Sequence, residues 1–151
     1  MVPVTSARAI ATARRLFREY AAEVGEPRCF GNFAQEVEHL PAPYIAPAGR
    51  LLLATLGRKS AGVVGARPWS RRICEMKRLY VRPEFRGRGI GRALAEAIVE
   101  EARRIGYARM RLDSLESMKV ARAMYRRLGF REIRPYLPPS GARTHYMELR
   151  L

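Results

Sequence analysis

The segment Arg86-Gly87-Arg88-Gly89-Ile90-Gly91 is the part of this chain best suited to chemistry. It lies between an apolar extended run at 76–81 and an amphipathic run that begins at its own isoleucine. A glycine-rich turn from a strand into a helix directs several backbone N–H groups, and the positive end of the helix dipole, toward one point. The arginines of the segment, together with Arg92, add cationic donors that suit phosphate oxygens. These features predict a phosphate-binding loop.

Two well-known phosphate loops do not fit this spacing. The dinucleotide fingerprint needs a third glycine where Arg92 stands, and the nucleoside triphosphate loop needs a Gly-Lys-Ser/Thr sequence that the segment lacks. The remaining alternative is an ordinary solvated turn rich in glycine and arginine. On the loop alone, both a phosphate site and such a turn stay open.

The elements around the loop follow from hydrophobic periodicity and turn residues. Helices are expected from the Ser6 cap to Gly25-Glu26-Pro27, and at about 30–39, 90–105 and 117–128. Strands are expected at 51–56, 61–66, 73–81, 107–113, 130–134 and 144–149, and the proline-rich segment 40–47 is expected to be irregular. Only 2–4 remains of a first strand, so the sheet is expected to have a shortened or missing edge strand. This order indicates a mixed α/β sheet with helices on both faces.

Length and composition favour one folded domain over residues 1–151, because 48% of the residues are hydrophobic. No run approaches about 18 consecutive apolar residues, and no secretory signal is visible, so we expect a cytoplasmic protein with no membrane partner. Cys29 and Cys74 have no close partner, so both thiols are expected to be reduced. His39 and His145 stand alone, and no metal site is expected. The oligomeric state stays open, a homodimer included.

The positive charge raises a different class of function. Lysine and arginine total 29 against 14 acidic residues, a formal charge of +15. Such a surface attracts polyanions, so a basic nucleic-acid-binding module is the non-enzymatic alternative. The charges are dispersed along the chain, and neither zinc-finger spacing nor an aromatic RNA-binding strand motif is present. We therefore rank a nucleic-acid partner below a phosphate-rich cofactor.

Several motifs together resemble the GNAT superfamily of N-acetyltransferases. The spacing Arg86-x-x-Gly89-x-Gly91 resembles the family's acyl-coenzyme A loop, and the strand end 79–83 resembles the segment before it. The run 121–130 resembles the family's helix with alanine, a tyrosine four residues later and then Gly-Phe, and 146–149 resembles its last strand. The resemblance covers residues 51–151.

The resemblance implies a mostly antiparallel sheet with a central V-shaped splay. In such a fold the strands at about 73–81 and 108–113 separate, and the pantetheine arm of acetyl-CoA enters between them. The arm is then expected to pair with backbone near Leu79, Tyr80 and Val81, and the pyrophosphate to lie on 86–91 with Arg92 nearby. The implied reaction is direct transfer: a neutral amine attacks the thioester, and the thiolate leaves.

The resemblance also implies an acid and a base. Tyr125 is expected to protonate the departing sulfur, since its ordinary pKa of about 10 is close to that of a thiol; the structural alternative is a core tyrosine packed on Ala121. Glu75 is expected to deprotonate the amine, directly or through water, and its alternative is a salt bridge with a neighbouring cation. Asp113 and Glu116 are weaker candidates for the base. In a regular strand, Glu75 would share one face of the sheet with Lys77, Leu79 and Val81, because side chains alternate between the two faces. A bulge near the splay would interrupt this alternation.

One departure from the family pattern concerns the cofactor. Many members carry asparagine seven residues before the tyrosine, where Met118 stands here, so that cofactor contact is in doubt. The acceptor pocket is expected from the N-terminal helices, the 40–50 loop, Trp69 and the segment 135–145. A primary amine of a small molecule is the expected acceptor, and a protein or peptide amine is the alternative.

Overall fold

A computed structural model describes residues 1–25 and 31–151. A seven-stranded sheet with the order β1-β2-β3-β4-β5-β7-β6 forms its centre. The strands are β1 (Val2–Pro3), β2 (Arg50–Leu56), β3 (Lys59–Ser70), β4 (Ile73–Val81), β5 (Arg109–Leu115), β6 (Arg131–Glu132) and β7 (Thr144–Arg150). Neighbouring strands are antiparallel except for β4 and β5, which run parallel. The mixed, mostly antiparallel sheet is therefore confirmed.

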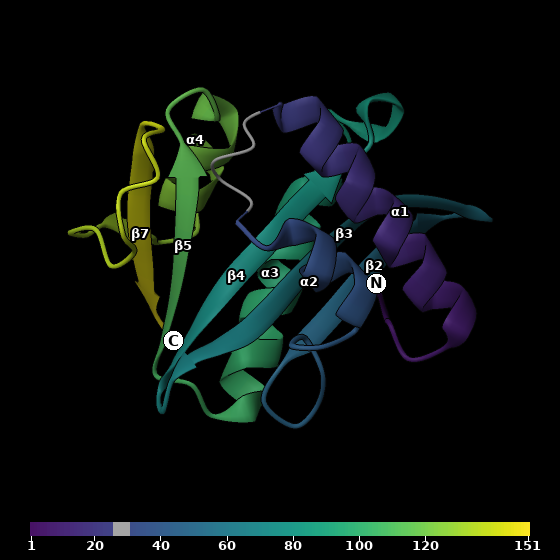
Figure 1. Ribbon diagram of the computed structural model, residues 1–151, viewed down its shortest axis with the longest axis horizontal. Helices are drawn as coiled ribbons and strands as arrows, with labels where there is room; N and C mark the ends of the chain where they lie inside the picture. The colour runs from purple at the N-terminus through teal and green to yellow at the C-terminus, as the bar shows by residue number, and fades with distance from the viewer. Residues whose placement is uncertain (26–30) are drawn as a thin grey trace.

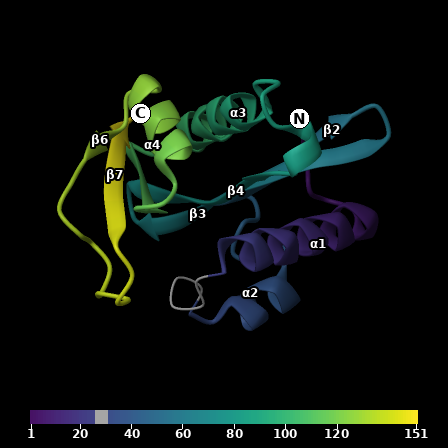
Figure 2. The same cartoon turned by 90° about the horizontal axis from the view of Figure 1, so that it is seen from above.

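Helices cover both faces of this sheet, as expected. Figure 2 shows α1 (Ala7–Val24) and α2 (Phe33–His39) on one face, and α3 (Ile90–Ile105) and α4 (Lys119–Arg127) on the other. Each face has its own buried cluster: Leu16, Phe17 and Tyr44 belong to the first, and Leu94 and Ile98 to the second. The sheet thus separates two cores, and a residue's position along a strand decides which core it joins.

The helix ends follow the local signals in the sequence. The Ser6 side chain accepts a hydrogen bond from the backbone N–H of Ala9 at 3.2 Å, which satisfies one free donor of α1. The helix ends at Gly25, and α3 ends at Gly106, both in the left-handed conformation that glycine adopts without strain. Glu26, Pro27, Cys29 and the expected start of the second helix lie outside the described residues.

Some expected boundaries were wrong. Strand β3 continues beyond position 66 and includes Trp69, because the hairpin with β4 extends to the pair Ser70↔Ile73. The expected strand at 130–134 is reduced to two residues, since only Arg131 and Glu132 pair with β7. The edge strand is present but short: β1 pairs antiparallel with β2 through two residues. The 40–47 segment forms turns without regular structure.

A bulge in β4 changes which face its residues occupy. Val63 pairs with Tyr80 and Gly65 with Lys77, so β4 has one more residue than β3 between these pairs. Arg78 lies in this interval with a φ of 60°, a left-handed conformation that is unusual for a residue other than glycine. Leu79 consequently packs with the α3 core, whereas Tyr80 joins the α1 core.

The two parallel strands in the middle of the sheet separate. β4 and β5 pair only from Ile73↔Arg109 to Glu75↔Arg111, although both strands continue beyond these pairs. Figure 1 shows the two strands close together near the C-terminus and apart at their other ends. The expected splay is therefore present. No helix in the described part of the chain has the length and apolar character needed to cross a bilayer.

Candidate active site

A narrow slot occupies the gap where β4 and β5 separate. It has a volume of about 70 Å³. Apolar, small and charged side chains of both strands line it, and residues of α1 and α4 contribute from the two faces of the sheet. Among its residues are Tyr20, Leu79, Ser114, Met118, Ala121 and Tyr125. The slot thus lies between the separated strands, with residues of both helical layers in its lining.

The Tyr125 hydroxyl belongs to this slot. Helix α4 carries Tyr125, whose ring packs on Phe130 with a centroid distance of 5.7 Å. The side chain is 7% exposed, and its hydroxyl makes no hydrogen bond to any residue that the structure describes. Burial, with the negative charge of Asp113 as a further cause, raises the pKa of Tyr125 above its ordinary value. The phenol therefore remains protonated at neutral pH and is a proton donor toward the slot.

The glycine-rich loop leads directly from β4 into α3. Gly87 and Gly89 have φ values of 74° and 75°, and Gly89 is the N-cap of α3. No side chain caps this helix, so the backbone N–H groups of its first turn remain available to a ligand. A Cβ added at Gly87 or Gly89 would meet nothing within 4 Å. An open, uncapped helix start beside the slot fits a phosphate group.

The arginines of the loop differ in their contacts. Arg86 is exposed but already has partners: its guanidinium donates to the Glu23 carboxylate at 2.6 Å and to the Val81 carbonyl at 2.9 Å. Arg92 pairs with Glu96 one turn along α3 on the exposed surface. Arg88 lies over the Phe85 ring with its Cζ 5.9 Å from the centroid. Among the described residues no ion pair engages Arg88, so the loop offers this cation as well as backbone N–H groups as donors.

A larger cavity meets the slot on the α1–α2 face of the sheet. Its volume is about 680 Å³, within the range of small-molecule pockets. The lining comes from α2, the 40–50 loop, β3, β4, β5 and the segment 137–146. Lys77, Arg78 and Asp113 line both cavities. These three residues therefore mark the point where two molecules, one in each cavity, would come into contact.

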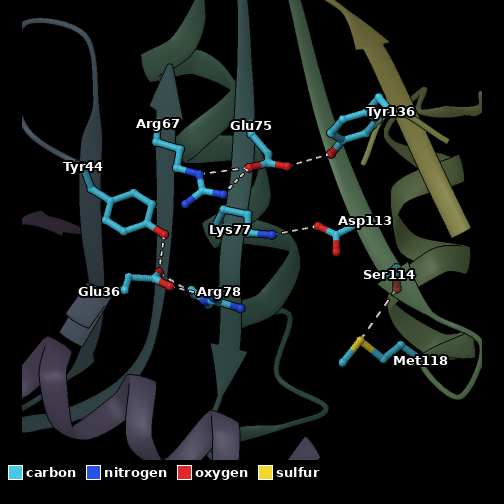
Figure 3. A network of polar contacts seen from close by, with 10 residues as sticks. All are labelled: Glu36, Tyr44, Arg67, Glu75, Lys77, Arg78, Asp113, Ser114, Met118 and Tyr136. Carbon is cyan, nitrogen blue, oxygen red and sulfur yellow. Dashed lines mark hydrogen bonds and ion pairs between the residues drawn. The ribbon is translucent and has the colours of Figure 1, made fainter. Parts of the chain in front are cut away.

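An ion-pair partner and a tyrosine lie behind Arg67, which lines the larger cavity (Figure 3). The Arg67 guanidinium donates twice to Glu75 Oε1, at 2.9 and 2.8 Å, and the Tyr136 hydroxyl donates to Glu75 Oε2 at 2.9 Å. Glu75 is completely buried, so both of its oxygens are used inside the protein. The salt bridge that the sequence offered as an alternative role for Glu75 is present, and the role of base stays a prediction.

A second ion pair joins α2 to the sheet. Arg78 donates to both carboxylate oxygens of Glu36, at 3.1 and 2.6 Å, and Tyr44 donates its hydroxyl to the same carboxylate. Burial acts to raise the pKa of Glu36, but the hydrogen bond and charge of Arg78 outweigh it and lower that pKa. The bulge at Arg78 makes this contact possible, because it brings two consecutive cations to the same face.

A third ion pair crosses the splay. Lys77 Nζ lies 2.8 Å from Asp113 Oδ1, and the two residues come from the separated strands β4 and β5. Burial acts to raise the pKa of Asp113, but the charge and hydrogen bond of Lys77, together with the charge of Arg78, outweigh burial and lower that pKa. Asp113 therefore stays ionised at neutral pH. A carboxylate with a lowered pKa attracts an ammonium group but accepts its proton poorly.

Other expected site residues lie elsewhere or in new surroundings. Trp69 packs edge-on against Tyr136 at 5.0 Å and is absent from the cavity lining, so it supports the wall instead of forming it. Glu116 binds His145 on the exposed side of the sheet. Met118 lines the slot, where its sulfur accepts from Ser114. Sequence reasoning missed Glu36, Tyr44, Arg67, Lys77, Arg78 and Tyr136. The one local signal was the adjacent pair Lys77-Arg78 inside a strand whose other residues, apart from Glu75, are apolar.

The Glu36–Arg78 pair makes a testable contribution to stability. We expect Glu36→Gln to lower the free energy of unfolding by about 3 kcal/mol at neutral pH, because it leaves the buried Arg78 charge without its counter-ion. The pKa of Glu36 is lowered in the folded protein, so its contribution is present above the ordinary glutamate pKa. The contribution is lost as the pH falls through the lowered value. Urea unfolding at neutral and acid pH measures both effects.

The matched control is Glu96→Gln, which removes an exposed ion pair with Arg92. We expect this variant to lose less than about 0.5 kcal/mol. An equal loss in the two variants, or a loss in Glu36→Gln that persists unchanged in acid, would contradict the assignment of a buried pair that joins α2 to the sheet.

The chain is similar to known acetyltransferases in sequence and in fold. The model of the acetyltransferase (GNAT) family matches residues 10–130. An uncharacterized N-acetyltransferase of Schizosaccharomyces pombe is 34% identical over 140 residues, which cover 91% of this chain and 86% of that protein. The chain therefore belongs to the GNAT family and is an N-acetyltransferase.

Solved structures agree with this fold. An acetyltransferase from Streptococcus agalactiae has a TM-score of 0.75 and 18% identity, with 91% of each chain covered. A GNAT acetyltransferase from Elizabethkingia anophelis, crystallised with acetyl-CoA bound, has a TM-score of 0.60 and 20% identity. That match covers 69% of this chain and 77% of the other.

Proposed function

We propose that this protein transfers an acetyl group from acetyl-CoA directly to a primary amine of a small molecule. One observation carries the proposal: the slot beside Tyr125 and the larger cavity meet at Lys77, Arg78 and Asp113. A thioester in the slot and an amine in the cavity would reach one another at this junction. The volume of about 680 Å³ suits a small acceptor better than an extended peptide.

The loop and the slot divide the task of holding the cofactor. Backbone N–H groups of 87–91 and the start of α3 suit the pyrophosphate, since two glycines keep the approach open. The edge of β4 that faces β5 is unpaired beyond Glu75, and its backbone near Leu79 suits the amide groups of the pantetheine arm. Near Val81 the carbonyl already accepts from Arg86, so the arm would have to use the remaining backbone groups or displace that side chain. When bound, acetyl-CoA supplies an activated acyl group. A cocrystal of a solved relative with acetyl-CoA supports this choice of cofactor.

Tyr125 and the junction formed by Lys77, Arg78 and Asp113 have different roles in the reaction. Asp113 attracts the incoming ammonium group, which loses one proton to solvent before the neutral amine attacks the thioester carbonyl. As the carbon–sulfur bond breaks, Tyr125 donates its proton to the departing sulfur, and the second amine proton restores the Tyr125 hydroxyl. Glu75 lies behind Arg67 and Tyr136, so a proton reaches it from the amine only through an intervening group such as water. Coenzyme A release in the presence of a library of small amines tests the function. Failure to bind coenzyme A, or release that no amine stimulates, would overturn it.

Glu75→Gln separates the two roles open to this carboxylate. Its burial and its three hydrogen bonds lead us to expect the structural outcome: a stability loss of about 2 kcal/mol and an unchanged acidic limb of the pH–rate profile. A relay role through water predicts the opposite pattern, with the acidic limb removed and stability nearly kept. The measurements are urea unfolding and kcat across pH with saturating acetyl-CoA.

A further inference from the structure

We propose that the acceptor is an amino acid, whose carboxylate binds Arg67 and whose amine lies beside Asp113. This inference rests on the proposed function and names the substrate class of the same site. It begins from a difference among the three cations that line the larger cavity, Arg67, Lys77 and Arg78.

Arg67 is the cation whose own counter-ion does not face the cavity. Lys77 and Arg78 share the lining with their partners, Asp113 and Glu36. The partner of Arg67 is Glu75, which is fully buried and absent from the lining. Arg67 therefore presents positive charge to the cavity, while its neutralising carboxylate lies behind it. An anionic group on the ligand would complete this wall.

The N–H groups of Arg67 also differ: some bind Glu75, and others are open to a ligand. Its Nε and Nη2 both donate to Glu75, and Nη1 has no hydrogen-bond partner among the described residues. The Arg67 side chain is 29% exposed, against 9% for Lys77 and 8% for Arg78. Arg67 is thus the cation that a ligand can reach. Charge-assisted hydrogen bonds to a planar guanidinium suit a carboxylate.

Glu75 and Tyr136 hold the Arg67 guanidinium in place. Two hydrogen bonds to one carboxylate oxygen fix the plane of the guanidinium, and the Tyr136 hydroxyl fixes the other oxygen of that carboxylate. Figure 3 shows the Arg67 guanidinium on the same side of the sheet as the Lys77 side chain, with Asp113 reaching in from β5. An anchor held in this way loses little conformational freedom when a ligand binds.

The amine end of the ligand has a partner across β4. Asp113 Oδ1 accepts from Lys77, and no side chain among the described residues donates to its Oδ2. Asp113 also lines the slot, so an amine beside it lies at the junction with the cofactor site. Arg67 on β3 and Asp113 on β5 therefore offer opposite charges on the two sides of β4. A zwitterion matches this arrangement, and a simple alkylamine matches only half of it.

Amino acids paired with their own amides test the carboxylate. The pair differs little in size, and the amide's amine is less basic, so a larger fraction of it is already neutral and reactive. Basicity alone would therefore make the amide the better acceptor, and a preference for the amino acid would show that the protein recognises its carboxylate. We expect at least one amino acid, among α- and ω-amino acids, to exceed its amide about 10-fold or more in kcat/KM. Calorimetry of the same pairs with the coenzyme A-loaded protein gives a readout independent of turnover.

Variants of Arg67 test whether this residue causes the preference for the amino acid over its amide. Arg67→Lys keeps a charge for Glu75 but removes the planar fork, and Arg67→Gln removes both. We expect KM for the amino acid to rise about 10-fold or more in either variant, with KM for the amide nearly unchanged. Arg50→Gln is the matched control, because Arg50 has a similar exposure of 28% and an ion pair with Glu101 away from the cavity. Urea unfolding checks that all variants are folded.

The outcomes distinguish this inference from the proposed function. Amine-stimulated release of coenzyme A with equal use of acids and amides would overturn the inference and leave the proposed function standing. A preference that survives in Arg67→Lys and Arg67→Gln would also overturn it, as would better use of phosphoethanolamine than of β-alanine. Amino-acid binding that requires Arg67, without any turnover, would support the ligand class and contradict the transfer reaction.

Discussion

Tyr125→Phe is expected to lower kcat about 100-fold or more while the Kd for acetyl-CoA stays within about 2-fold of wild type. The change removes one hydroxyl and keeps the ring that packs on Phe130. Because burial raises the pKa of Tyr125, the phenol is fully protonated in the free enzyme and donates only as negative charge develops on the sulfur. Its loss therefore weakens the transition state and leaves binding unchanged. Steady-state kinetics and calorimetry with acetyl-CoA measure the two quantities.

Tyr107→Phe provides the matched control for this experiment. Tyr107 donates its hydroxyl to the Ala48 carbonyl outside both cavities, so kcat should be close to wild type in this variant. Wild-type turnover in Tyr125→Phe would show that water or another group protonates the thiolate. A parallel loss of acetyl-CoA affinity would instead make Tyr125 a packing residue of the slot.

Gly89→Val is expected to weaken coenzyme A binding about 100-fold or more. Two effects combine at this position. Gly89 has a φ of 75°, which a β-branched residue adopts only with strain, and a side chain would occupy the open space in front of the uncapped helix. Charge-assisted hydrogen bonds to the pyrophosphate each contribute about 1.5–3 kcal/mol, so the loss of two accounts for the expected effect. Calorimetric titration with coenzyme A measures it.

Gly57→Val separates backbone strain from the blocked site. Gly57 lies in the turn between β2 and β3 with a φ of 58° and, like Gly89, has nothing within 4 Å of an added Cβ. Both variants should lose similar stability, but only Gly89→Val should lose coenzyme A affinity. An unchanged Kd in folded Gly89→Val would remove the pyrophosphate from residues 86–91.

The loop and the helices that frame the site could be predicted because their signals are local. A glycine such as Gly89 permits a left-handed turn wherever it occurs, and α3 shows its apolar stripe within one stretch of chain. The separation of β4 and β5 was also predicted, but only through the motifs of the family. Tyr125 was named for the same reason, and the structure places it in the slot.

The surroundings of the larger cavity depend on contacts between distant parts of the chain. Tyr136 meets Glu75 across 61 positions, and Arg78 meets Glu36 across 42. No periodicity within a single element reports such a meeting, because it depends on how α2 and the segment before β7 pack on the sheet.

The sequence by itself determined the family, the glycine-rich turn into α3 and the mixed sheet, since each depends on residue types at short, fixed spacings. Only the tertiary structure decided that Lys77 and Arg78 face the same cavity. A regular strand would have sent these neighbours to opposite faces. The bulge, with Arg78 in a left-handed conformation, is maintained by the register with β3 and by the ion pair to Glu36. The strand register and the ion pair form only when distant segments pack together, so no short stretch of the sequence predicts either of them.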